Sequence, residues 1–208
     1  MIYIIITTSI FNINGGANKD LTHRQRRYVD SISNLLQLIQ NDVSIKPIIV
    51  ENNGLSNTYL DRLNCEVCYT NNNQFRYPHK GMHELLDIKD VIKQYNIQDE
   101  DVIIKLTGRY KVLDLSFINL VKKNMDTHDA FLKFFRVSEK IYMFNDCVLG
   151  LFSIKCKFLK DFKYKCVTSP EVEFAEYVRE SIDKDKLMEV QQLNLECCFA
   201  DDLHILVV

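Results

Sequence analysis

The chain has 208 residues, 47% of them hydrophobic, which is enough for one domain with a sizeable core. A formal net charge of −2, with scattered lysines, argues against a general binder of nucleic acid, because such a protein carries a basic stripe. No run reaches the roughly 18 apolar residues of a membrane span, and the opening MIYIIITTSI lacks the basic start of a signal peptide.

The first half of the chain alternates short apolar runs with amphipathic helical segments. Strands are predicted at 2–7, 46–50, 66–69 and 101–105, and helices at 21–40, 58–63 and 83–95. This order predicts an α/β fold with a parallel, doubly wound sheet. No GxGxxG fingerprint follows the first strand and no Walker A sequence is present, so an ordinary Rossmann dehydrogenase and a P-loop enzyme are disfavoured.

The second half predicts closely spaced strands and a mixed sheet. Strand-like runs lie at 129–135, 141–146, 149–155, 194–199 and 203–208. Ser169 as N-cap and Pro170 at the first helical position open a helix that runs to about residue 182. We expect one domain, 1–208, with halves 1–114 and 115–208, and the apolar end of the chain is compatible with a first domain of a longer protein.

The seven cysteines are an odd number without paired spacing, which is typical of reduced thiols in a cytoplasmic protein. Cys65 and Cys68 have C-x-x-C spacing, but they fall in a predicted strand, where the two thiols would point to opposite faces. We therefore expect core cysteines there rather than zinc ligands.

Polar segments follow the predicted parallel strands at their carboxyl ends, where ligands bind in doubly wound sheets. They are Thr7-Thr8-Ser9, Glu51 to Gly54, Thr70 to Gln74, and Thr107-Gly108-Arg109. The acidic run 99–101 precedes a strand, so it lies at the opposite end of the sheet and is interpreted as a solvated turn. His79 and His83 flank the predicted start of a helix and are interpreted as surface residues.

A parallel half followed by a mixed half resembles the GT-A fold of glycosyltransferases. The opening MIYIIITTSI resembles the first strand of that fold, and SPEVEFAEYV resembles the helix start that carries an acidic pair in many inverting members. Two other stretches resemble small glycosyltransferases of large DNA viruses (chlorella-virus-like) and bacteria: KLTGRY and DCVLGLFSIKCKFLKDF. The resemblance implies transfer of a sugar from a nucleoside diphosphate, UDP above all, to the hydroxyl of a glycan or glycoprotein acceptor, with inversion. It also implies a cytoplasmic location, in the host cytoplasm if the protein is viral.

The resemblance further implies roles for residues of the first half. The strand end Thr7-Thr8-Ser9 falls where the family seats the nucleoside, and Glu51 falls where an acid meets the base or ribose. The segment Lys105 to Arg109, including Thr107, occupies the place of the metal-binding Asp-x-Asp. Because neither Thr nor Arg replaces two carboxylates around Mn²⁺ or Mg²⁺, a divalent cation stays an open question.

A cationic alternative to the metal is therefore expected. Arg109, with Lys105, Arg76 or Lys80, would stabilise the negative charge that develops on the leaving diphosphate. Read without the resemblance, Arg109 is a strand-end residue paired with Asp114, and Glu51 is part of ordinary turn chemistry. Lys105, inside an apolar strand, needs a buried partner, and an acid fits that need as well as a phosphate does.

Three carboxylates are candidates for the general base that takes the acceptor proton: Glu171, Glu173 and Asp146. Glu171 and Glu173 lie roughly 200° apart around a helix, so both cannot face one acceptor, and Glu171 fits the family position better. Acidic residues in a first helical turn also favour the helix dipole without any catalytic role. The rival function is a non-catalytic nucleotide- or sugar-binding module of a larger assembly protein.

Overall fold

The computed structural model describes residues 1–11, 21–77, 79–198 and 205–208. Its main sheet has seven strands in the order β3-β2-β1-β4-β7-β6-β8, and a small second sheet has the order β10-β9-β5. The strands are β1 (Ile2–Thr8), β2 (Ile45–Glu51), β3 (Glu66–Tyr69), β4 (Val102–Thr107), β5 (Lys111–Val112), β6 (Ala130–Leu132), β7 (Leu151–Lys155), β8 (Leu187–Glu189), β9 (Leu195–Cys198) and β10 (Ile205–Val207). The helices are α1 (Leu21–Ile39), α2 (Lys80–Gln94), α3 (Ser116–Asn124), α4 (Cys156–Asp161) and α5 (Pro170–Ser181), with short 3-10 turns η1 (Tyr59–Leu63), η2 (Asn72–Gln74) and η3 (Lys184–Lys186).

The main sheet is parallel over its first half and mixed over its second. β1, β2, β3 and β4 run parallel, β7 is antiparallel to both β4 and β6, and β8 is parallel to β6. Because β1 lies between β2 and β4, the carboxyl ends of these three strands meet at one edge of the sheet. The predicted α/β fold, with a mostly parallel sheet and a mixed C-terminal half, is confirmed.

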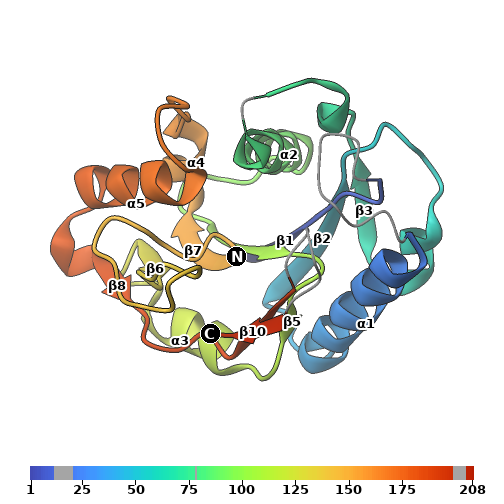
Figure 1. Ribbon diagram of the computed structural model, residues 1–208. Coiled ribbons are helices and arrows are strands. Elements are labelled where there is room, and N and C mark those ends of the chain that lie inside the picture. Colours follow the sequence, from blue (N-terminus) through green and yellow to red (C-terminus); the bar gives the residue numbers. More distant parts are fainter. Residues whose placement is uncertain (12–20, 78, 199–204) are drawn as a thin grey trace.

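Two layers of helices cover the sheet. α2, α4 and α5 lie on one face, and α1 and α3 lie on the other together with the small sheet (Figure 1). Strand side chains alternate between these layers, so Ile104 and Leu106 of β4 pack towards α1 while Ile103 packs towards α2. Lys105 has the same orientation as Ile103, which sends its long side chain towards α2.

Several predicted elements need correction. Residues 141–146 form no strand: Ile141 makes an isolated bridge with Arg136, and the side chains of Ile141, Tyr142 and Phe144 are exposed. Their apolar character reflects a surface loop rather than a half-buried strand. The helices α3 and α4 were missed because each is short, and segment 58–63 is a 3-10 turn.

The turn after β4 brings three segments into close contact. The N–H of Gly108 donates to the carbonyl of Thr7 at 2.9 Å, and a Cβ on Gly108 would lie 2.9 Å from Cγ2 of Thr8 and 3.1 Å from a ring carbon of Tyr28. Glycine is therefore required here by close approach.

No described helix combines the length and the apolar character that crossing a bilayer requires.

Candidate active site

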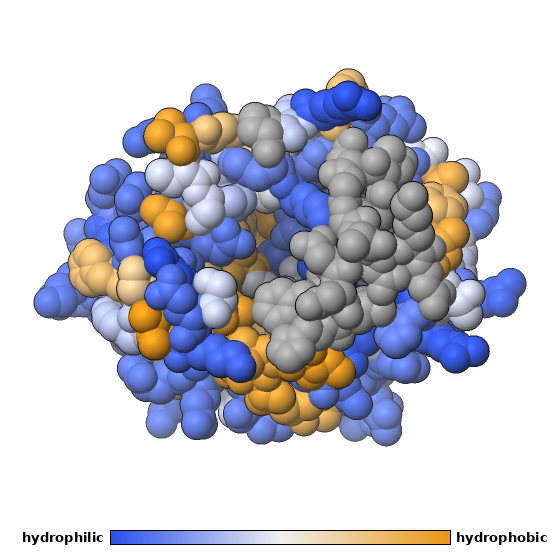
Figure 2. Space-filling view, in the orientation of Figure 1, coloured by the Kyte–Doolittle hydropathy of each residue, from blue (hydrophilic) through white to orange (hydrophobic). Residues whose placement is uncertain are grey.

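A cavity of about 760 Å³ opens at the carboxyl ends of β1 and β4. It lies near the middle of the face that Figure 2 shows. Ser9, Arg24 and Arg109 line it from the first half of the chain, and Asp146 and Glu171 line it from the second. This is the edge at which the sequence predicts ligand binding.

Two arginines provide positive charge on the first-half side of the cavity. Arg24, on α1, is only 7% exposed, and its Nε and Nη2 donate to the Ser9 carbonyl at 2.8 Å and the Tyr28 hydroxyl at 3.1 Å. Nε of Arg109 donates to the carbonyl of Cys198 at 2.7 Å. Among the described residues no carboxylate forms an ion pair with either guanidinium. Glu51 and Glu84 act on Arg24 and Arg109 only from beyond ion-pair distance, so this arrangement favours an anionic ligand in direct contact with the guanidiniums.

The backbone at Arg109 is fixed from α1. Nε of Arg27 and the hydroxyl of Ser31 both donate to the Arg109 carbonyl, at 2.8 and 3.2 Å. The predicted alternative, an ion pair between Arg109 and Asp114, does not form: the Asp114 carboxylate accepts from the Ser116 N–H at 2.8 Å instead. Arg109 is thus held in place by main-chain contacts, and its charge is left for the cavity.

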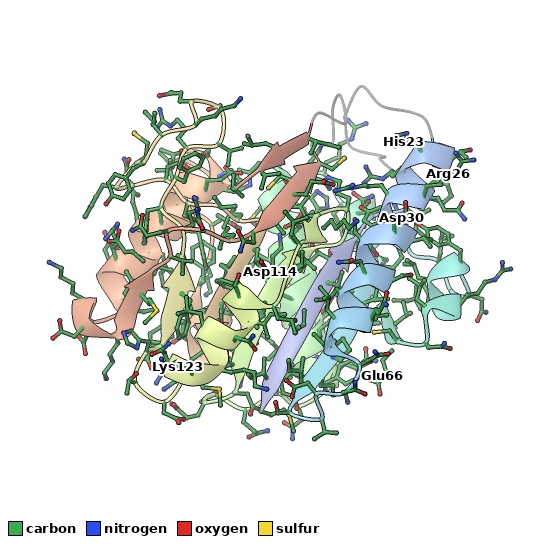
Figure 3. All side chains as sticks on the ribbon, turned by 90° about the horizontal axis from the view of Figure 1, so that it is seen from below. His23, Arg26, Asp30, Glu66, Asp114 and Lys123 are labelled. Atoms are coloured by element: carbon green, nitrogen blue, oxygen red, sulfur yellow. The ribbon has the colours of Figure 1, made fainter. Side chains whose placement is uncertain are left out.

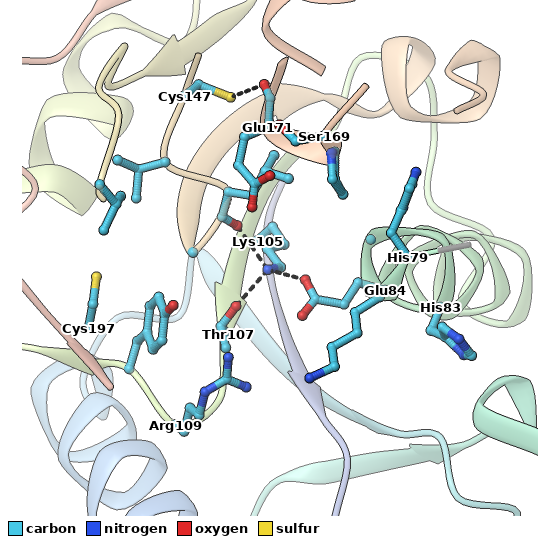
Figure 4. Close-up of a pocket in the computed structure, with 18 of the residues that line it drawn as sticks. His79, His83, Glu84, Lys105, Thr107, Arg109, Cys147, Ser169, Glu171 and Cys197 are labelled. Carbon is cyan, nitrogen blue, oxygen red and sulfur yellow. Dashed lines mark hydrogen bonds and ion pairs between the residues drawn. The ribbon is translucent and has the colours of Figure 1, made fainter. Parts of the chain in front are cut away.

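Lys105 lies at the floor of the cavity, 2% exposed. Its Nζ is 2.5 Å from Oε2 of Glu84, 2.7 Å from Oγ1 of Thr107 and 2.8 Å from the carbonyl of Leu149 (Figure 4). The sequence left open whether Lys105 meets an acid or a phosphate, and the structure pairs it with an acid. That acid, Glu84 on α2, was missed because nothing in the sequence distinguishes it from an ordinary surface glutamate of an amphipathic helix.

The end of β1 is tied to the end of β2. The Thr8 hydroxyl donates to Oε2 of Glu51 at 2.7 Å, and the N–H groups of Ile10 and Asn53 donate to the same carboxylate at 3.2 Å. Burial raises the pKa of Glu51 above its ordinary value, although these donors and the charge of Arg24 oppose the rise. Glu51 is fully buried and does not line the cavity, so it fixes the loop that presents Ser9.

Thr7 is buried as well, and its hydroxyl lies 3.4 Å from the carbonyl of Leu106. Of the three residues at this strand end, only Ser9 lines the cavity. Thr7 and Thr8 therefore shape the site from behind.

The loops after β2 and β3 are held by one buried carboxylate on α2. Asp87 accepts hydrogen bonds of 2.8 Å from the side chains of Asn52, Thr70 and Asn72. Burial raises the pKa of Asp87 to about 7 despite these donors. Asp87 was missed too, because it stands at a core-facing position of α2 and its loop partners Asn52, Thr70 and Asn72 come from other elements.

The N-termini of α2 and α5 meet beside the cavity. A Cβ on Gly81 would lie 2.7 Å from Cβ of Pro170, so the two helices approach each other closely. Ser169 caps α5 as predicted, its hydroxyl accepting from the N–H of Val172 at 3.3 Å. Helix N-termini favour negative charge, which adds to the preference of this edge for an anion.

Glu171 lines the cavity and points into it from α5 (Figure 4). Within the described residues its carboxylate has no hydrogen bond or ion pair. The carboxylate of Glu173 instead accepts from the backbone N–H groups of Lys165, Cys166, Val167 and Thr168, at 2.5–3.1 Å. Burial opposes ionisation of Glu173, but these four donors outweigh it and hold its pKa below the ordinary value.

Asp146 lines the cavity from the loop before β7. Its Oδ2 is 3.1 Å from Nε of Arg136, whose Nη1 is 3.0 Å from Glu139. The charge of Asp146 is therefore already partnered, in contrast to that of Glu171.

The segment before α2 places its polar residues differently. Lys80, the first residue of α2, lines the cavity, whereas Arg76 is exposed and does not. His83 was predicted at the surface, and this is wrong: it is 5% exposed, with Nδ1 3.0 Å from the carbonyl of Asn72. His79 is partly buried against the ring of Tyr164. The helix starts three residues earlier than predicted, which turns His83 inwards.

The residues at the carboxyl end of β4 do not fit a divalent cation held in the manner of Asp-x-Asp. Thr107, Gly108 and Arg109 offer one hydroxyl and a positive charge where two carboxylates are needed. In the described ranges no group of three or more His, Cys, Asp or Glu side chains converges on a point that could hold a metal. Neither Cys65 nor Cys68 forms a disulfide; Cys68 is buried as expected of a core cysteine, and Cys65 is half-buried.

The acidic run 99–101 lies at the far end of the sheet and is neutralised there. Asp99 and Glu100 pair with Lys160 and Lys157 at 2.5 and 2.9 Å, and Asp101 pairs with the amino terminus at 3.0 Å. The predicted solvated turn is confirmed.

The strand order, the mixed second half and the cavity at the carboxyl ends define a GT-A-like fold, that of nucleotide-diphospho-sugar transferases. No family model and no curated protein matches the chain. Solved structures do match at the level of fold. A protein of Desulfovibrio desulfuricans G20, provisionally described as a nucleotide-diphospho-sugar transferase, aligns with a TM-score of 0.56 and 7% identity over 91% of this chain and 79% of its own.

Two further structures extend the comparison. A mannosyltransferase of Pyrobaculum calidifontis, in complex with GDP-mannose and Mn²⁺, aligns with a TM-score of 0.56 and 10% identity over 98% of this chain and 55% of its own. A CMP:2-keto-3-deoxy-manno-octonic acid synthetase complexed with CTP aligns with a TM-score of 0.54 and 8% identity over 91% and 89%. At such identities the likeness establishes the fold alone.

Proposed function

We propose that the protein is an inverting glycosyltransferase that moves a sugar from a nucleoside diphosphate, UDP, to an acceptor hydroxyl. The observation that carries the proposal is the charge pattern of the cavity. Arg24 and Arg109, whose guanidiniums have no carboxylate partner among the described residues, line one side, and Glu171, whose carboxylate has no partner in the same ranges, lines the other. A diphosphate needs the positive charge of the arginines, and an acceptor hydroxyl needs the carboxylate of Glu171 as its base.

The arginines serve the leaving group. When the bond between the anomeric carbon and the diphosphate oxygen breaks, negative charge grows on that oxygen. Preorganised guanidiniums stabilise such charge through forked hydrogen bonds, and their value is largest where water is excluded. Arg109 is anchored through its carbonyl and its Nε, so it can act without reorganisation.

Glu171 serves the acceptor. Its carboxylate takes the proton of the acceptor hydroxyl while that oxygen bonds to the anomeric carbon, on the face opposite the departing nucleoside diphosphate. One bond forms as another breaks, and the configuration of the sugar inverts. Glu173 cannot assist directly, because backbone donors occupy both of its oxygens.

The remaining residues position these groups. Ser9 lies on the nucleoside side, with Thr8 and Glu51 supporting its loop from below. Asp146 and Arg136 lie on the acceptor side and offer hydrogen bonds to a glycan acceptor. In this proposal residues 1–114 hold the nucleotide and residues 115–208 hold the acceptor.

Thermal-shift measurements with UDP, GDP, CMP and their sugar conjugates, followed by an assay of nucleotide release, test the proposal. We expect UDP to raise the melting temperature and a UDP-sugar to be hydrolysed slowly in the absence of acceptor. Nucleotide binding without any release would favour the non-catalytic binding module instead. Release of pyrophosphate from CTP or UTP with a sugar phosphate would assign the fold's other activity, nucleotidyl transfer.

A further inference from the structure

The ammonium of Lys105 is enclosed by three oxygen atoms from three separate parts of the fold. Oε2 of Glu84 comes from α2, Oγ1 of Thr107 from the end of β4, and the carbonyl of Leu149 from the loop before β7. Their distances from Nζ are 2.5, 2.7 and 2.8 Å. We call these three oxygens and the ammonium the Lys105 cage (Figure 4).

The cage leaves the ammonium no free donor. A lysine ammonium has three N–H bonds, and three acceptors use all of them. At 2% exposure Lys105 is also closed to water. The ammonium therefore cannot donate to a phosphate without breaking one of these contacts, so Lys105 is a positioning residue rather than a phosphate ligand.

The three oxygens are of the kind that divalent cations choose. A carboxylate, a carbonyl and a hydroxyl are hard ligands, typical of Ca²⁺, Mg²⁺ and Mn²⁺ sites. They converge at the carboxyl end of β4, next to the turn where Asp-x-Asp would stand and where this chain has Thr107-Gly108-Arg109. We propose that the ammonium of Lys105 is a built-in cation that fills this oxygen cage in place of a divalent ion, and that nucleotide binding by this protein is therefore independent of metal.

Charge supports the same conclusion. The positive charge of Lys105 is balanced by Glu84 inside the cage. In the part of the chain that the structure describes, no carboxylate forms an ion pair with the guanidinium of Arg24 or Arg109, so both can meet a diphosphate directly. The part of the proposal that concerns nucleotide rests on the proposed function, whereas the part that concerns the cage does not.

The cage is tested with Mn²⁺ alone, without nucleotide, by calorimetry and by the shift in melting temperature. Lys105→Ala removes the ammonium and opens the space between the three oxygens, so we expect it to bind Mn²⁺ at least tenfold more tightly than the wild type. Lys105→Met removes the charge but keeps the space filled, and it should not gain Mn²⁺ binding. Glu84→Gln in the Lys105→Ala background removes the carboxylate and should abolish the gain.

If Lys105→Ala does not bind Mn²⁺ more tightly than Lys105→Met, the proposal that the Lys105 ammonium fills a cation site is wrong. Tight binding of Mn²⁺ by the wild type would overturn it as well, and this measurement needs no variant to fold.

The nucleotide arm compares the affinity of wild-type protein for UDP in EDTA and in Mn²⁺. We expect the two dissociation constants to agree within about twofold, and a loss of tenfold or more in EDTA would contradict metal independence. If no nucleotide binds under either condition, the proposed function fails, while the Mn²⁺ titrations still decide on the cage.

Discussion

Glu171 and Glu173 lie two residues apart in the first turn of α5, yet their carboxylates have opposite surroundings. Glu171 lines the cavity without a partner among the described residues, and Glu173 is 7% exposed and accepts four backbone hydrogen bonds from residues 165–168. The same helix thus provides one carboxylate that is available for proton transfer and one that holds a loop.

The first prediction concerns Glu171. Glu171→Gln keeps the shape of the side chain and removes its basicity, so turnover should fall by roughly 10²–10⁴ while the affinity for UDP is unchanged. Because the carboxylate has no hydrogen bond or ion pair in the described ranges, the melting temperature should stay within about 1–2 °C of the wild type, the range of an ordinary surface substitution. Steady-state kinetics and a thermal melt on the same preparation measure both.

Glu173→Gln is the matched variant, and it should behave in the reverse way. The amide would place its NH₂ group against backbone N–H donors, so at least two of the four hydrogen bonds are lost. Each hydrogen bond to a charged group contributes roughly 1.5–3 kcal/mol, so the melting temperature should fall by several degrees. Activity per folded molecule should change little. Normal turnover in both variants would move the base to Asp146.

The stabilisation by Glu173 should depend on pH. Its pKa in the folded protein is lowered, so ionised Glu173 stabilises the fold above the ordinary glutamate pKa of about 4.3, and this contribution is lost as the pH falls through the lowered value. The difference in melting temperature between the wild type and Glu173→Gln should therefore be full near pH 7 and shrink in acid. A difference that grows below pH 4 would contradict this account of the carboxylate.

The two cavity arginines, Arg24 and Arg109, give another prediction. Arg109→Ala should lower kcat/KM, because roughly 2–4 kcal/mol of transition-state stabilisation is lost. Arg24→Ala should weaken UDP binding by roughly 1.5–3 kcal/mol. Arg26→Ala is the control, since Arg26 lies on the exposed side of the same helix (Figure 3). Calorimetry measures the affinity of each variant for UDP, and steady-state kinetics measure kcat/KM. Equal affinity in Arg24→Ala and Arg26→Ala would remove Arg24 from the diphosphate site.

Gly108 offers a test of how β4 is joined to the site. Gly108→Ala would bring a methyl group within 2.9 Å of Thr8 and 3.1 Å of both Thr7 and Tyr28, in a buried place with little room to yield. Overpacking of this kind costs about 1–3 kcal/mol. We expect a lower midpoint of denaturant unfolding with an unchanged slope, together with weaker UDP binding because Tyr28 also contacts Arg24. An unchanged midpoint would show that the turn is not under this constraint.

The sequence predicted those parts of the fold that depend on local pattern. Apolar runs located β1, β2, β3 and β4 to within two residues at each end, and Ser169-Pro170 located the start of α5. Their order along the chain then implied which edge of the sheet carries the cavity, since parallel strands end on the same side. Residues 141–146 failed because apolar side chains on an exposed loop have the same pattern as a strand.

The partners of the site residues could not be predicted, because they come from distant positions. Glu84 reaches Lys105 from another element, and nothing in the local sequence distinguishes Arg24 from its neighbours Arg26 and Arg27. Its role depends on the helical turn that buries it while its neighbours stay outside or half-buried. The unequal roles of Glu171 and Glu173 likewise depend on a loop that folds over only one of them.

Proton NMR of the anomeric signals during turnover of a UDP-sugar decides whether this protein is an inverting glycosyltransferase. With water as the slow acceptor, UDP and free sugar should appear in equal amounts. The first-formed sugar should have the configuration opposite to that of the donor, and Glu171→Gln should abolish the signal. Bound UDP-sugar that is never cleaved, or a released sugar that retains the donor configuration, would contradict the proposed function.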